Sequence, residues 1–289
     1  MRIQVEPANA VIGAIIHDLD LSKQLDEETA SQVRDLFYQY SVLCFRGQNL
    51  AEADFVRFSH IFGDLETHFL SEYQRPGHPE IYVVSNIVEN GKAIGISDAG
   101  TEWHTDSSWA KAPSAASILY AVEVPVRQGV VLGNTLFSSM TAAYDTLDPD
   151  LRGKLKELRA SHGYEHRHAQ RMKAAGSTRK ELTEEQKKRA TGATHPVIRT
   201  HPVTAKSCVY VNKWFTTGLV GVPEQEAEPL LQSVYSHVTK DDFIYRHKWQ
   251  KGDVIIWDNC AVQHKAIQDY ALPERRLMWR TTVQGSIPS

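Results

Sequence analysis

Two histidines and one aspartate, far apart along the chain, restrict how this sequence can fold. His104 and Asp106 lie in the string Glu-Trp-His-Thr-Asp, and His264 ends a distant string that begins Trp-Asp-Asn. Residues two apart on an extended strand project to the same side, so His104 and Asp106 can reach one point while Thr105 points away. If the fold brings His264 to that point, two imidazoles and one carboxylate cover one face of an octahedral ion. This donor set is typical of non-haem Fe(II) sites, which leave the opposite positions open.

A His-x-Asp string alone is weak support for a metal site, because this chain has 13 histidines and the pattern occurs by chance. A second cluster strengthens it. Arg276 follows His264 by twelve residues (276 − 264 = 12) in the string Arg-Arg-Leu-Met-Trp-Arg. On the following strand its planar guanidinium can bind the far carboxylate of a dicarboxylic acid while a 2-oxo acid end chelates the iron. Taken by itself, Arg276 is equally compatible with a solvated charge.

Composition indicates an ordinary globular protein and limits the partners. The 289 residues, with 42% hydrophobic and 23% charged content, favour one domain spanning residues 1–289. The net charge of −3 gives no reason to expect nucleic acid or an anionic membrane surface as a partner. Three cysteines without metal-ligand spacing indicate a reducing compartment, and no apolar stretch is long enough to span a membrane. A cytoplasmic location is therefore expected.

Helices are expected mainly at the ends of a β-rich middle. One is predicted from about Asp26 to Tyr40, with Asp26 as the N-cap. A second contains Phe55 and Phe58 and ends at Gly63. A third is opened by Pro223, and its predicted core face consists of Leu230, Leu231, Val234, Tyr235 and Val238. Strands are predicted where β-branched and aromatic residues concentrate: Ile81–Ser85, Ser117–Val124, Ser207–Asn212, Asp253–Trp257 and Leu277–Val283.

Two further segments have distinctive composition. Residues 89–101 contain three glycines directly before the first metal string, which predicts a flexible loop over the site. Residues 165–189 carry eight Lys or Arg against four Glu, which favours a solvated helical face over a binding surface.

Several strings occur in a consistent order along nearly the whole chain. They are Val-Leu-Cys-Phe-Arg-Gly-Gln at 42–48, Trp-His-Thr-Asp-Ser at 103–107, Gly-Asn-Thr-Leu-Phe at 133–137, His-Pro-Val-Ile-Arg-Thr-His-Pro at 195–202, Tyr-Val-Asn at 210–212, Trp-Asp-Asn at 257–259, Gln-His at 263–264 and the closing arginines. Together they resemble the taurine and aryloxyacetate dioxygenases, the TauD/TfdA family of Fe(II)- and 2-oxoglutarate-dependent oxygenases. The resemblance implies a mainly β fold with flanking helices around a double-stranded β-helix core of the jelly-roll, cupin-like kind. It also implies a helical, charged insert at about 165–190 near the active-site entrance, and a homo-oligomer, either dimer or tetramer.

The resemblance assigns roles to five residues. His104, Asp106 and His264 would hold Fe(II), Arg276 would pair with the 5-carboxylate of 2-oxoglutarate, and the Thr135 hydroxyl would support the same group. The chain is a few residues longer before Thr135 than the family's Gly-Gly-Asp/Asn-Thr string, so Thr135 equally suits a turn residue that enters a strand. The implied reaction consumes O₂ and 2-oxoglutarate, releases succinate and CO₂, and hydroxylates a C–H bond. Related halogenases lack the carboxylate ligand, so the presence of Asp106 predicts hydroxylation.

The substrate implied by the resemblance is a small anion. Arg280 matches an arginine that binds the substrate's sulfonate, His68 matches a substrate-facing histidine, and Phe215 matches an aromatic pocket wall. A surface charge, a core or capping histidine and a core phenylalanine are the respective alternatives. Positions that contact taurine in the family differ here, being occupied by Gly100, Ser71 and His168. The loss of partners for an amine disfavours taurine, and a carboxylate or sulfonate with a bulkier apolar body is predicted instead.

Two alternatives use the same metal face. A cupin-like protein without oxygenase activity could bind Zn(II) or Ni(II), which such a donor set holds more tightly than Fe(II), and act as an anion-binding module. A buried Arg276 opposite the metal argues against that alternative. A hydrolase or isomerase that uses the metal as a Lewis acid is the other, but the sequence indicates no nearby general base.

Overall fold

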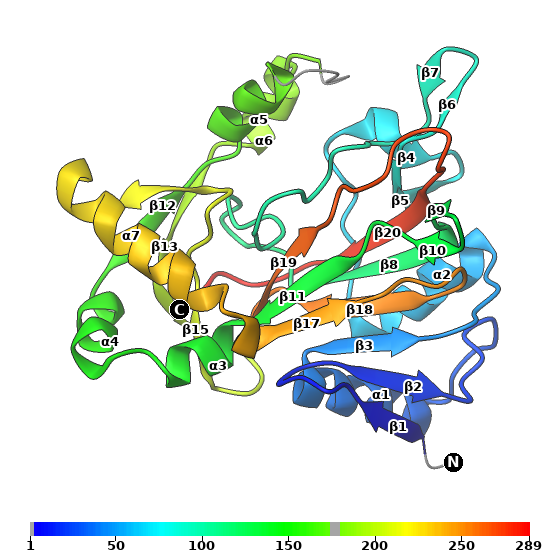
Figure 1. Ribbon diagram of the computed structural model, residues 1–289, viewed down its shortest axis with the longest axis horizontal. Coiled ribbons are helices and arrows are strands. Elements are labelled where there is room, and N and C mark those ends of the chain that lie inside the picture. Colours follow the sequence, from blue (N-terminus) through cyan, green and yellow to red (C-terminus); the bar gives the residue numbers. More distant parts are fainter. Residues whose placement is uncertain (1–2, 174–179) are drawn as a thin grey trace.

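Two β-sheets that face each other form the centre of the molecule (Figure 1). The computed structural model describes residues 3–173 and 180–289. The larger sheet is antiparallel except for the parallel β2–β3 pair. Its strand order is β1 (Gln4–Pro7), β2 (Ala14–His17), β3 (Val42–Phe45), β18 (Val254–Asp258), β8 (Ala116–Glu123), β20 (Leu277–Val283), β5 (His78–Ser85) and β4 (Gln74–Arg75). The smaller sheet has the order β17 (Ile244–His247), β11 (Thr135–Ser139) and β19 (Val262–Ala266).

The central strand β18 explains how the layers are held together. All five of its residues are buried, as expected for a strand covered on both faces. Alternate side chains divide between two cores. Val254 and Ile256 belong to the core on one face of the large sheet, whereas Ile255 and Trp257 pack toward the small sheet, where Trp257 lies 5.6 Å from Phe137 of β11. The strand therefore joins a helix-covered face to the face that carries the site.

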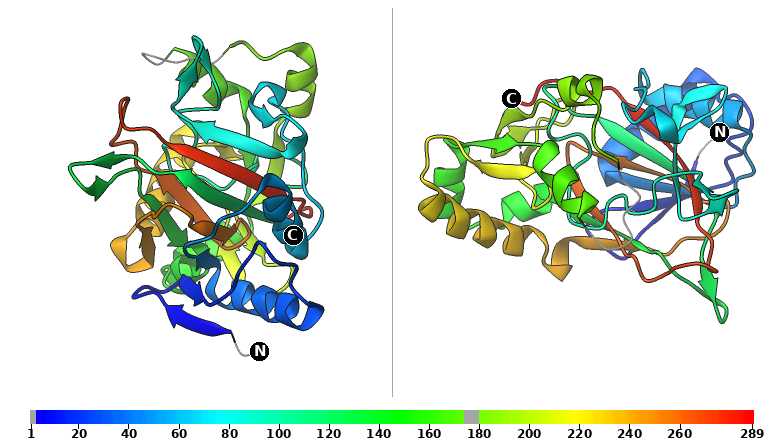
Figure 2. Two further views of the ribbon diagram at one scale, coloured as in Figure 1. Left: turned by 90° about the vertical axis from the view of Figure 1, so that its right-hand side faces the viewer. Right: turned by 90° about the horizontal axis from the view of Figure 1, so that it is seen from above.

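Helices α1 (Glu27–Tyr40) and α2 (Glu52–Ser59) cover the outer face of the large sheet (Figure 2). The prediction for α1 is confirmed: the Asp26 side chain accepts a hydrogen bond from the Thr29 amide at 2.7 Å, and Phe37 is buried in the shared core. The second predicted helix continues as a 3₁₀ turn over His60–Phe62. It ends at Gly63, whose φ of 138° is accessible to glycine at little cost.

A second, mixed unit lies beside the two sheets and has its own core (Figure 1). It contains α3 (Met140–Asp145), α4 (Pro149–Lys156), α7 (Glu224–Val238) and a three-stranded sheet in the order β13 (Ala193–Pro196), β12 (Arg159–His162) and β16 (Thr216–Leu219). The expectation that helices lie mainly at the chain ends is wrong, because α3 and α4 fall in the middle. They have six and eight residues, about two turns at most, which is too short for a clear repeat of apolar positions, the signal that sequence patterns depend on.

The third predicted helix, α7, follows Pro223 and buries Leu231, Val234 and Val238, while Leu230 and Tyr235 are only half-buried.

Of the five predicted strands, four correspond to β5, β8, β18 and β20. The predicted strand Ser207–Asn212 is shorter in the structure, where β15 (Ser207–Val209) pairs with β14 (Ile198–Thr200). Two short hairpins complete the described strands: β6 (Val88–Glu89) with β7 (Lys92–Ala93), and β9 (Val126–Arg127) with β10 (Val130–Val131).

The two segments with distinctive composition are more structured than their sequences suggest. Within residues 89–101, Ile96 is hydrogen-bonded to β5 through Val83 and Ser85 at 3.1 and 2.9 Å, so part of this loop is fixed against the sheet. Within residues 165–189 the chain forms α5 (Glu165–Met172) and α6 (Glu184–Arg189). The remainder of that segment, residues 174–179, lies outside the described residues.

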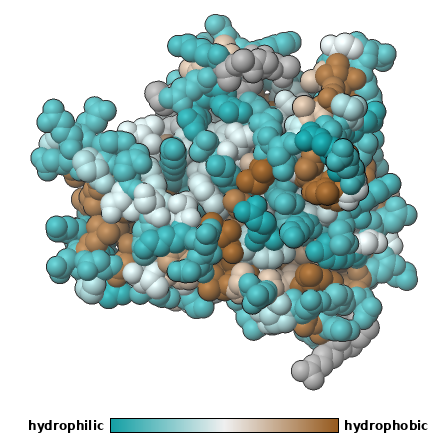
Figure 3. All heavy atoms as spheres, viewed as in Figure 1, coloured by the Kyte–Doolittle hydropathy of each residue, from teal (hydrophilic) through white to brown (hydrophobic). Residues whose placement is uncertain are grey.

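The surface is mostly polar on the face shown in Figure 3, where apolar residues form separate patches. Exposed valines include Val126 and Val130 of the β9–β10 hairpin and Val88 of β6. Such scattered residues do not by themselves define an interface. None of the helices in the described ranges combines the length and the apolar character needed to cross a bilayer.

Candidate active site

The two predicted histidines and the aspartate converge at the edge of the small sheet. Each offers a ligand atom, and these atoms all lie within 4.8 Å of one another in a buried cluster. Asp106 Oδ1 lies 3.5 Å from His104 Nε2, and Asp106 Oδ2 lies 3.9 Å from His264 Nε2. Neighbouring ligands of an octahedral ion are about 3 Å apart when the metal–ligand bonds are about 2.1 Å long. The donor set and its spacing therefore fit a divalent ion such as Fe(II).

Backbone pairing fixes the two histidines relative to each other. His104 and His264 form an isolated antiparallel bridge next to β19, with N–H to C=O distances of 3.1 and 2.8 Å. Directly opposed residues place their side chains on the same face, and the two imidazole centroids are 4.1 Å apart. The Thr105 hydroxyl instead donates to the Val262 carbonyl at 3.3 Å. The alternation predicted from His-x-Asp is thus present.

The tautomer of His104 follows from its second hydrogen bond. Its Nδ1 lies 2.8 Å from the Glu102 carbonyl oxygen, which can only accept. Nδ1 therefore carries the proton and Nε2 presents its lone pair to the cluster, the arrangement that metal-binding histidines use. His264 is enclosed by the rings of Phe137 and Trp257, and its Nδ1 has no hydrogen-bond partner among the described residues.

A chain of hydrogen bonds across two strands orients Asp106. The Trp257 indole donates to the Asn259 amide oxygen at 3.0 Å, and the Asn259 amide nitrogen donates to the Ser117 hydroxyl at 3.1 Å. Ser117 then donates its own proton to Asp106 Oδ2 at 2.7 Å. The Trp-Asp-Asn string was noted in the sequence without a role for Asn259, and Ser117 was noted only as the start of a strand. Their connection depends on the β18–β8 register, which pairs Trp257 with Ser117.

The electrostatic surroundings favour the ligand forms of these groups. Burial alone would raise the pKa of Asp106, but the Arg280 guanidinium and the two imidazoles outweigh it and hold that pKa well below its usual value. Burial and the neighbouring His104 lower the pKa of His264 well below its usual value. A carboxylate beside a neutral His264 imidazole can bind a metal ion without first losing protons.

Two other buried clusters have similar residue types but are already saturated. His201 accepts amide hydrogens from Val203 and Thr204 at Nδ1 and contacts Asp258 through Nε2 at 2.7 Å, so neither nitrogen is available. Its partner Cys260 has a pKa raised by burial and stays a thiol. In the second cluster, Asp253 contacts Arg46, His247 and the Gln250 amide. Both clusters are therefore structural.

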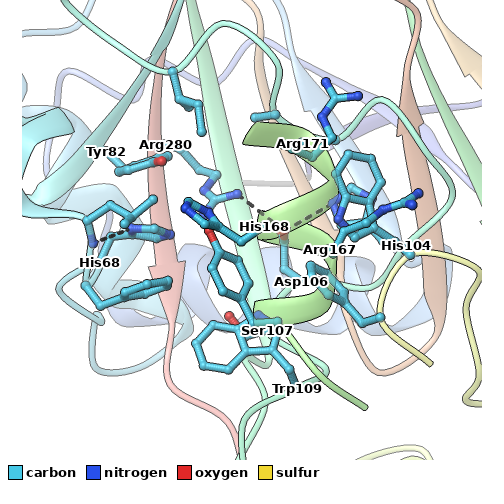
Figure 4. A pocket seen from close by; sticks show the side chains of 18 residues that line it. His68, Tyr82, His104, Asp106, Ser107, Trp109, Arg167, His168, Arg171 and Arg280 are labelled. Carbon is cyan, nitrogen blue, oxygen red and sulfur yellow. Dashed lines mark hydrogen bonds and ion pairs between the residues drawn. The ribbon is translucent and has the colours of Figure 1, made fainter. Parts of the chain in front are cut away.

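A pocket opens directly in front of His104 and Asp106 (Figure 4). It encloses about 630 Å³, including the open space at its mouth. Six of its 18 lining residues are aromatic: Phe69, Tyr82, Trp109, Tyr164, Trp214 and Phe215. This lining suits the apolar body of a small organic molecule.

The three residues predicted to contact substrate all line this pocket. Phe215 lies 6.0 Å from the His104 ring. His68 stacks on Tyr82 with ring centroids 3.9 Å apart, and its Nδ1 accepts a hydrogen bond from the Leu70 amide. The Arg280 guanidinium lies 5.1 Å from the Tyr82 ring centroid and contacts Asp106 Oδ1 at 3.3 Å. The sequence did not predict this contact between a substrate arginine and a metal ligand.

The positions that depart from the taurine pattern also have defined surroundings. Gly100 lines the pocket with a φ of 70°, and an added Cβ would lie 3.1 Å from the His104 ring. His168 is buried, lines the pocket and contacts the Lys180 carbonyl at 2.8 Å through Nε2. Ser71 begins a 3₁₀ turn and is exposed.

The interpretation of residues 165–189 as a solvated face is wrong for α5, because Arg167, His168 and Arg171 of this helix line the pocket. It is correct for α6, which is largely exposed.

Arg276 and Thr135 lie outside the pocket wall. Arg276 is only 4% exposed, and its Nε has no hydrogen-bond partner among the described residues. Thr135 is 4% exposed at the start of β11, where its hydroxyl accepts a hydrogen bond from the Trp249 indole at 3.1 Å. Tyr270 lies near Arg276 and near the residues that precede Thr135. Its ring centroid is 5.9 Å from the Arg276 guanidinium. A Cβ added at Gly133 would lie 2.9 Å from the same ring.

A buried face of two imidazoles and one carboxylate that opens onto an aromatic pocket is the arrangement of the non-haem, metal-dependent oxygenases. The family model described as taurine catabolism dioxygenase TauD, TfdA family matches residues 4–282. The chain belongs to this family, whose members are Fe(II)- and α-ketoglutarate-dependent dioxygenases.

Similar proteins differ in what they act on. Pentalenolactone F synthase of Streptomyces arenae is 32% identical over 275 residues, covering 93% of this chain and 91% of that protein. The alpha-ketoglutarate-dependent 2,4-dichlorophenoxyacetate dioxygenase of Cupriavidus pinatubonensis is 31% identical over 293 residues, covering 98% of each. The crystal structure of AAD-2 in complex with Mn(II) and N-oxalylglycine is 28% identical with a TM-score of 0.81, covering 100% of this chain and 99% of that chain. The resemblance inferred from the sequence strings is thus confirmed at the level of the family.

Proposed function

We propose that this protein hydroxylates a small organic acid, a carboxylate or sulfonate with a bulky apolar body, and that taurine is a poor substrate. The convergence of His104, Asp106 and His264 behind an aromatic pocket is the observation that carries this proposal. Fe(II), when bound with 2-oxoglutarate and O₂, supplies the oxidising chemistry that hydroxylates a C–H bond and releases succinate and CO₂. Because Asp106 occupies a ligand position, hydroxylation is favoured over halogenation.

Each residue of the centre has a separate task in this proposal. His104, Asp106 and His264 hold the metal, with the Ser117 hydroxyl keeping the Asp106 carboxylate in one orientation. Aromatic side chains around the pocket exclude water once substrate enters, which limits side reactions. Arg280 and His68 bind the substrate's acid group, and Phe215 contacts its apolar body.

The co-substrate is proposed to bind with its 5-carboxylate at Arg276 and Thr135. The buried, unpartnered Nε of Arg276 supports this, because a buried donor without an acceptor is costly. The Thr135 hydroxyl already accepts from the Trp249 indole, and an indole nitrogen can only donate. The hydroxyl proton of Thr135 is therefore available for an anion. A dicarboxylate such as 2-oxoglutarate is preferred over a 2-oxo monoacid.

Replacing Trp249 with Phe is expected to raise the KM for 2-oxoglutarate by about threefold to tenfold, the range for one neutral hydrogen bond. Phe keeps an aromatic ring beside His247, from which the Trp249 ring lies 4.5 Å, but it is smaller and leaves space in a fully buried site. Circular dichroism must therefore show that the variant is folded, and its affinity for metal should not change. Tyr245→Phe is the matched control, because it removes the contact between the Tyr245 hydroxyl and His247 without touching Thr135. An equal rise in KM for the organic substrate would contradict a role limited to Thr135.

Further parts of the proposal concern the whole molecule. We infer that the two facing sheets form a double-stranded β-helix, and that residues 1–289 make one domain with a helical insert at about 165–190. A cytoplasmic homo-oligomer, dimer or tetramer, is also proposed. Light scattering of the purified protein tests the assembly state.

A substrate panel tests the proposed function. The protein is incubated with Fe(II), ascorbate, 2-oxoglutarate and one candidate acid, and succinate and the oxidised product are measured. Aryloxyalkanoates, alkyl sulfonates or alkyl sulfates are expected to stimulate succinate formation more than taurine does. Clear preference for taurine would refute the substrate assignment, and a chlorinated product in chloride buffer would refute hydroxylation. No succinate with any acid would favour the non-oxygenase metal- and anion-binding alternative.

A further inference from the structure

The pocket in front of the metal ligands contains an unusual number of arginines. Arg280 comes from β20, whereas Arg167 and Arg171 come from α5, in the charged segment whose role the sequence left open. Figure 4 shows Arg280 with Tyr82 and His68 on one side of Asp106, and Arg167 and Arg171 on the side of His104. The pocket therefore presents positive charge at two places, with Arg280 over the Tyr82 ring and Arg167 over the Trp214 ring.

Two of the three arginines already have a carboxylate partner. Arg280 lies 3.3 Å from Asp106 Oδ1, and Arg171 lies 3.1 Å from Asp98. Once a metal ion shares the charge of Asp106, Arg280 is free to bind an anion from the substrate. Arg171 remains neutralised by Asp98 and serves mainly to attach α5 to the loop before the metal string.

Arg167 forms no ion pair with any described carboxylate, although the charge of the Glu102 carboxylate partly offsets the effect of burial on the pKa of Arg167. Its guanidinium lies 4.9 Å from the Trp214 ring centroid and donates to the Gln170 amide at 2.6 Å. Its Nε is buried without a hydrogen-bond partner, and none of the carboxylates in the described ranges lies within ion-pair distance of it. Burial lowers the pKa of Arg167 from its ordinary value. A guanidinium that is partly desolvated, held over an indole and without an ion-pair partner among the described residues can bind an anion through its unpaired Nε.

We propose that Arg167 binds a second anionic group of the substrate, across the aromatic pocket from Arg280, so that preferred substrates are acids with two anionic groups. This inference rests on the proposed function and narrows its substrate class. It also gives α5 a task in specificity, since the same cation repels an ammonium group and so disfavours amino acids and amino sulfonates.

Matched ligands test the proposal by direct binding. The protein is loaded anaerobically with Mn(II) and saturating N-oxalylglycine, which blocks the proposed co-substrate position. Titration calorimetry then compares phenoxyacetate with its ring-carboxylated derivatives, in which the second carboxylate is placed at each ring position. At least one diacid is expected to bind the wild type about tenfold more tightly than the monoacid.

Variants distinguish a direct contact between Arg167 and the second anionic group from a general effect of positive charge in this segment. Arg167→Gln is expected to remove the preference for the diacid while leaving the Kd of the monoacid unchanged, and Arg167→Lys to retain part of it. Lys187→Gln is the control, because it removes one positive charge from the exposed helix α6 in the same segment and should leave the preference intact.

The outcomes distinguish this inference from the proposed function. If monoacids bind as tightly as every diacid and are hydroxylated, the proposed function stands and the role of Arg167 is refuted. Equal weakening of both ligands by Arg167→Gln would also refute it, since that indicates a structural role. If neither ligand class binds or supports succinate formation, both proposals fail.

Discussion

Replacing Asp106 with Ala will abolish 2-oxoglutarate turnover and lower the affinity for Fe(II) or Mn(II) by at least about 100-fold. Loss of residues that merely orient a metal ligand already costs about 10–100-fold, and this substitution removes one of the three ligands. Its carboxylate oxygens lie 3.5 and 3.9 Å from the two histidine Nε2 atoms, so the remaining imidazoles cannot complete the face. Anaerobic titration with Mn(II) measures the affinity, and succinate formation measures the turnover.

A control and a structural check accompany this variant. Cys260→Ser alters a buried cluster that also combines a histidine and an aspartate, but His201 and Asp258 are saturated by hydrogen bonds, so Mn(II) affinity should match the wild type. Because Asp106→Ala also removes the carboxylate that Arg280 contacts and the acceptor of the Ser117 hydroxyl proton, circular dichroism must show that the variant is folded. Wild-type Mn(II) affinity in a folded Asp106→Ala protein would rule out this cluster as the metal centre.

The metal face could be predicted because it depends on short-range geometry. His104 and Asp106 are two residues apart, and an extended backbone is enough to place them on one side. The pairing of His104 with His264 is a long-range feature, and only the order of the sequence strings indicated it. The helix at 26–40 could also be predicted, since the Asp26 N-cap and the apolar spacing are local signals.

Residues that support the site could not be predicted from local patterns. Ser117 reaches Asp106 only because β18 and β8 pair in the register that aligns Trp257 with Ser117. Likewise, the charge of residues 165–189 does not indicate which side of α5 faces inward, and Arg167 lines the pocket while α6 is mostly exposed. A register and a helix orientation are set by packing across the whole fold, whereas composition reports only that the residues are polar.

Arg276→Leu will raise the KM for 2-oxoglutarate by about 30-fold or more, while leaving the affinity for Mn(II) alone unchanged. Removing one member of a buried, charge-assisted pair costs about 2–5 kcal/mol, and about 1.4 kcal/mol corresponds to a tenfold change. Arg276 is 4% exposed and its Nε lacks a partner within the described part of the chain, so an incoming carboxylate finds a donor that no described protein group satisfies. Arg276→Lys should give an intermediate value, since it keeps the charge but not the planar fork.

The neighbouring arginine provides a matched control for this substitution. Arg275 is half exposed at its side chain and pairs with Glu123 on the surface, so Arg275→Leu should leave the KM for 2-oxoglutarate unchanged. A ligand pair isolates the carboxylate: 2-oxobutyrate keeps the chelating end of 2-oxoglutarate but lacks the second carboxylate. The wild type should strongly prefer 2-oxoglutarate, and Arg276→Leu should lose most of that preference by weakening 2-oxoglutarate alone. If the variant weakens both ligands to the same extent, Arg276 supports the fold around Tyr270 and does not bind the co-substrate.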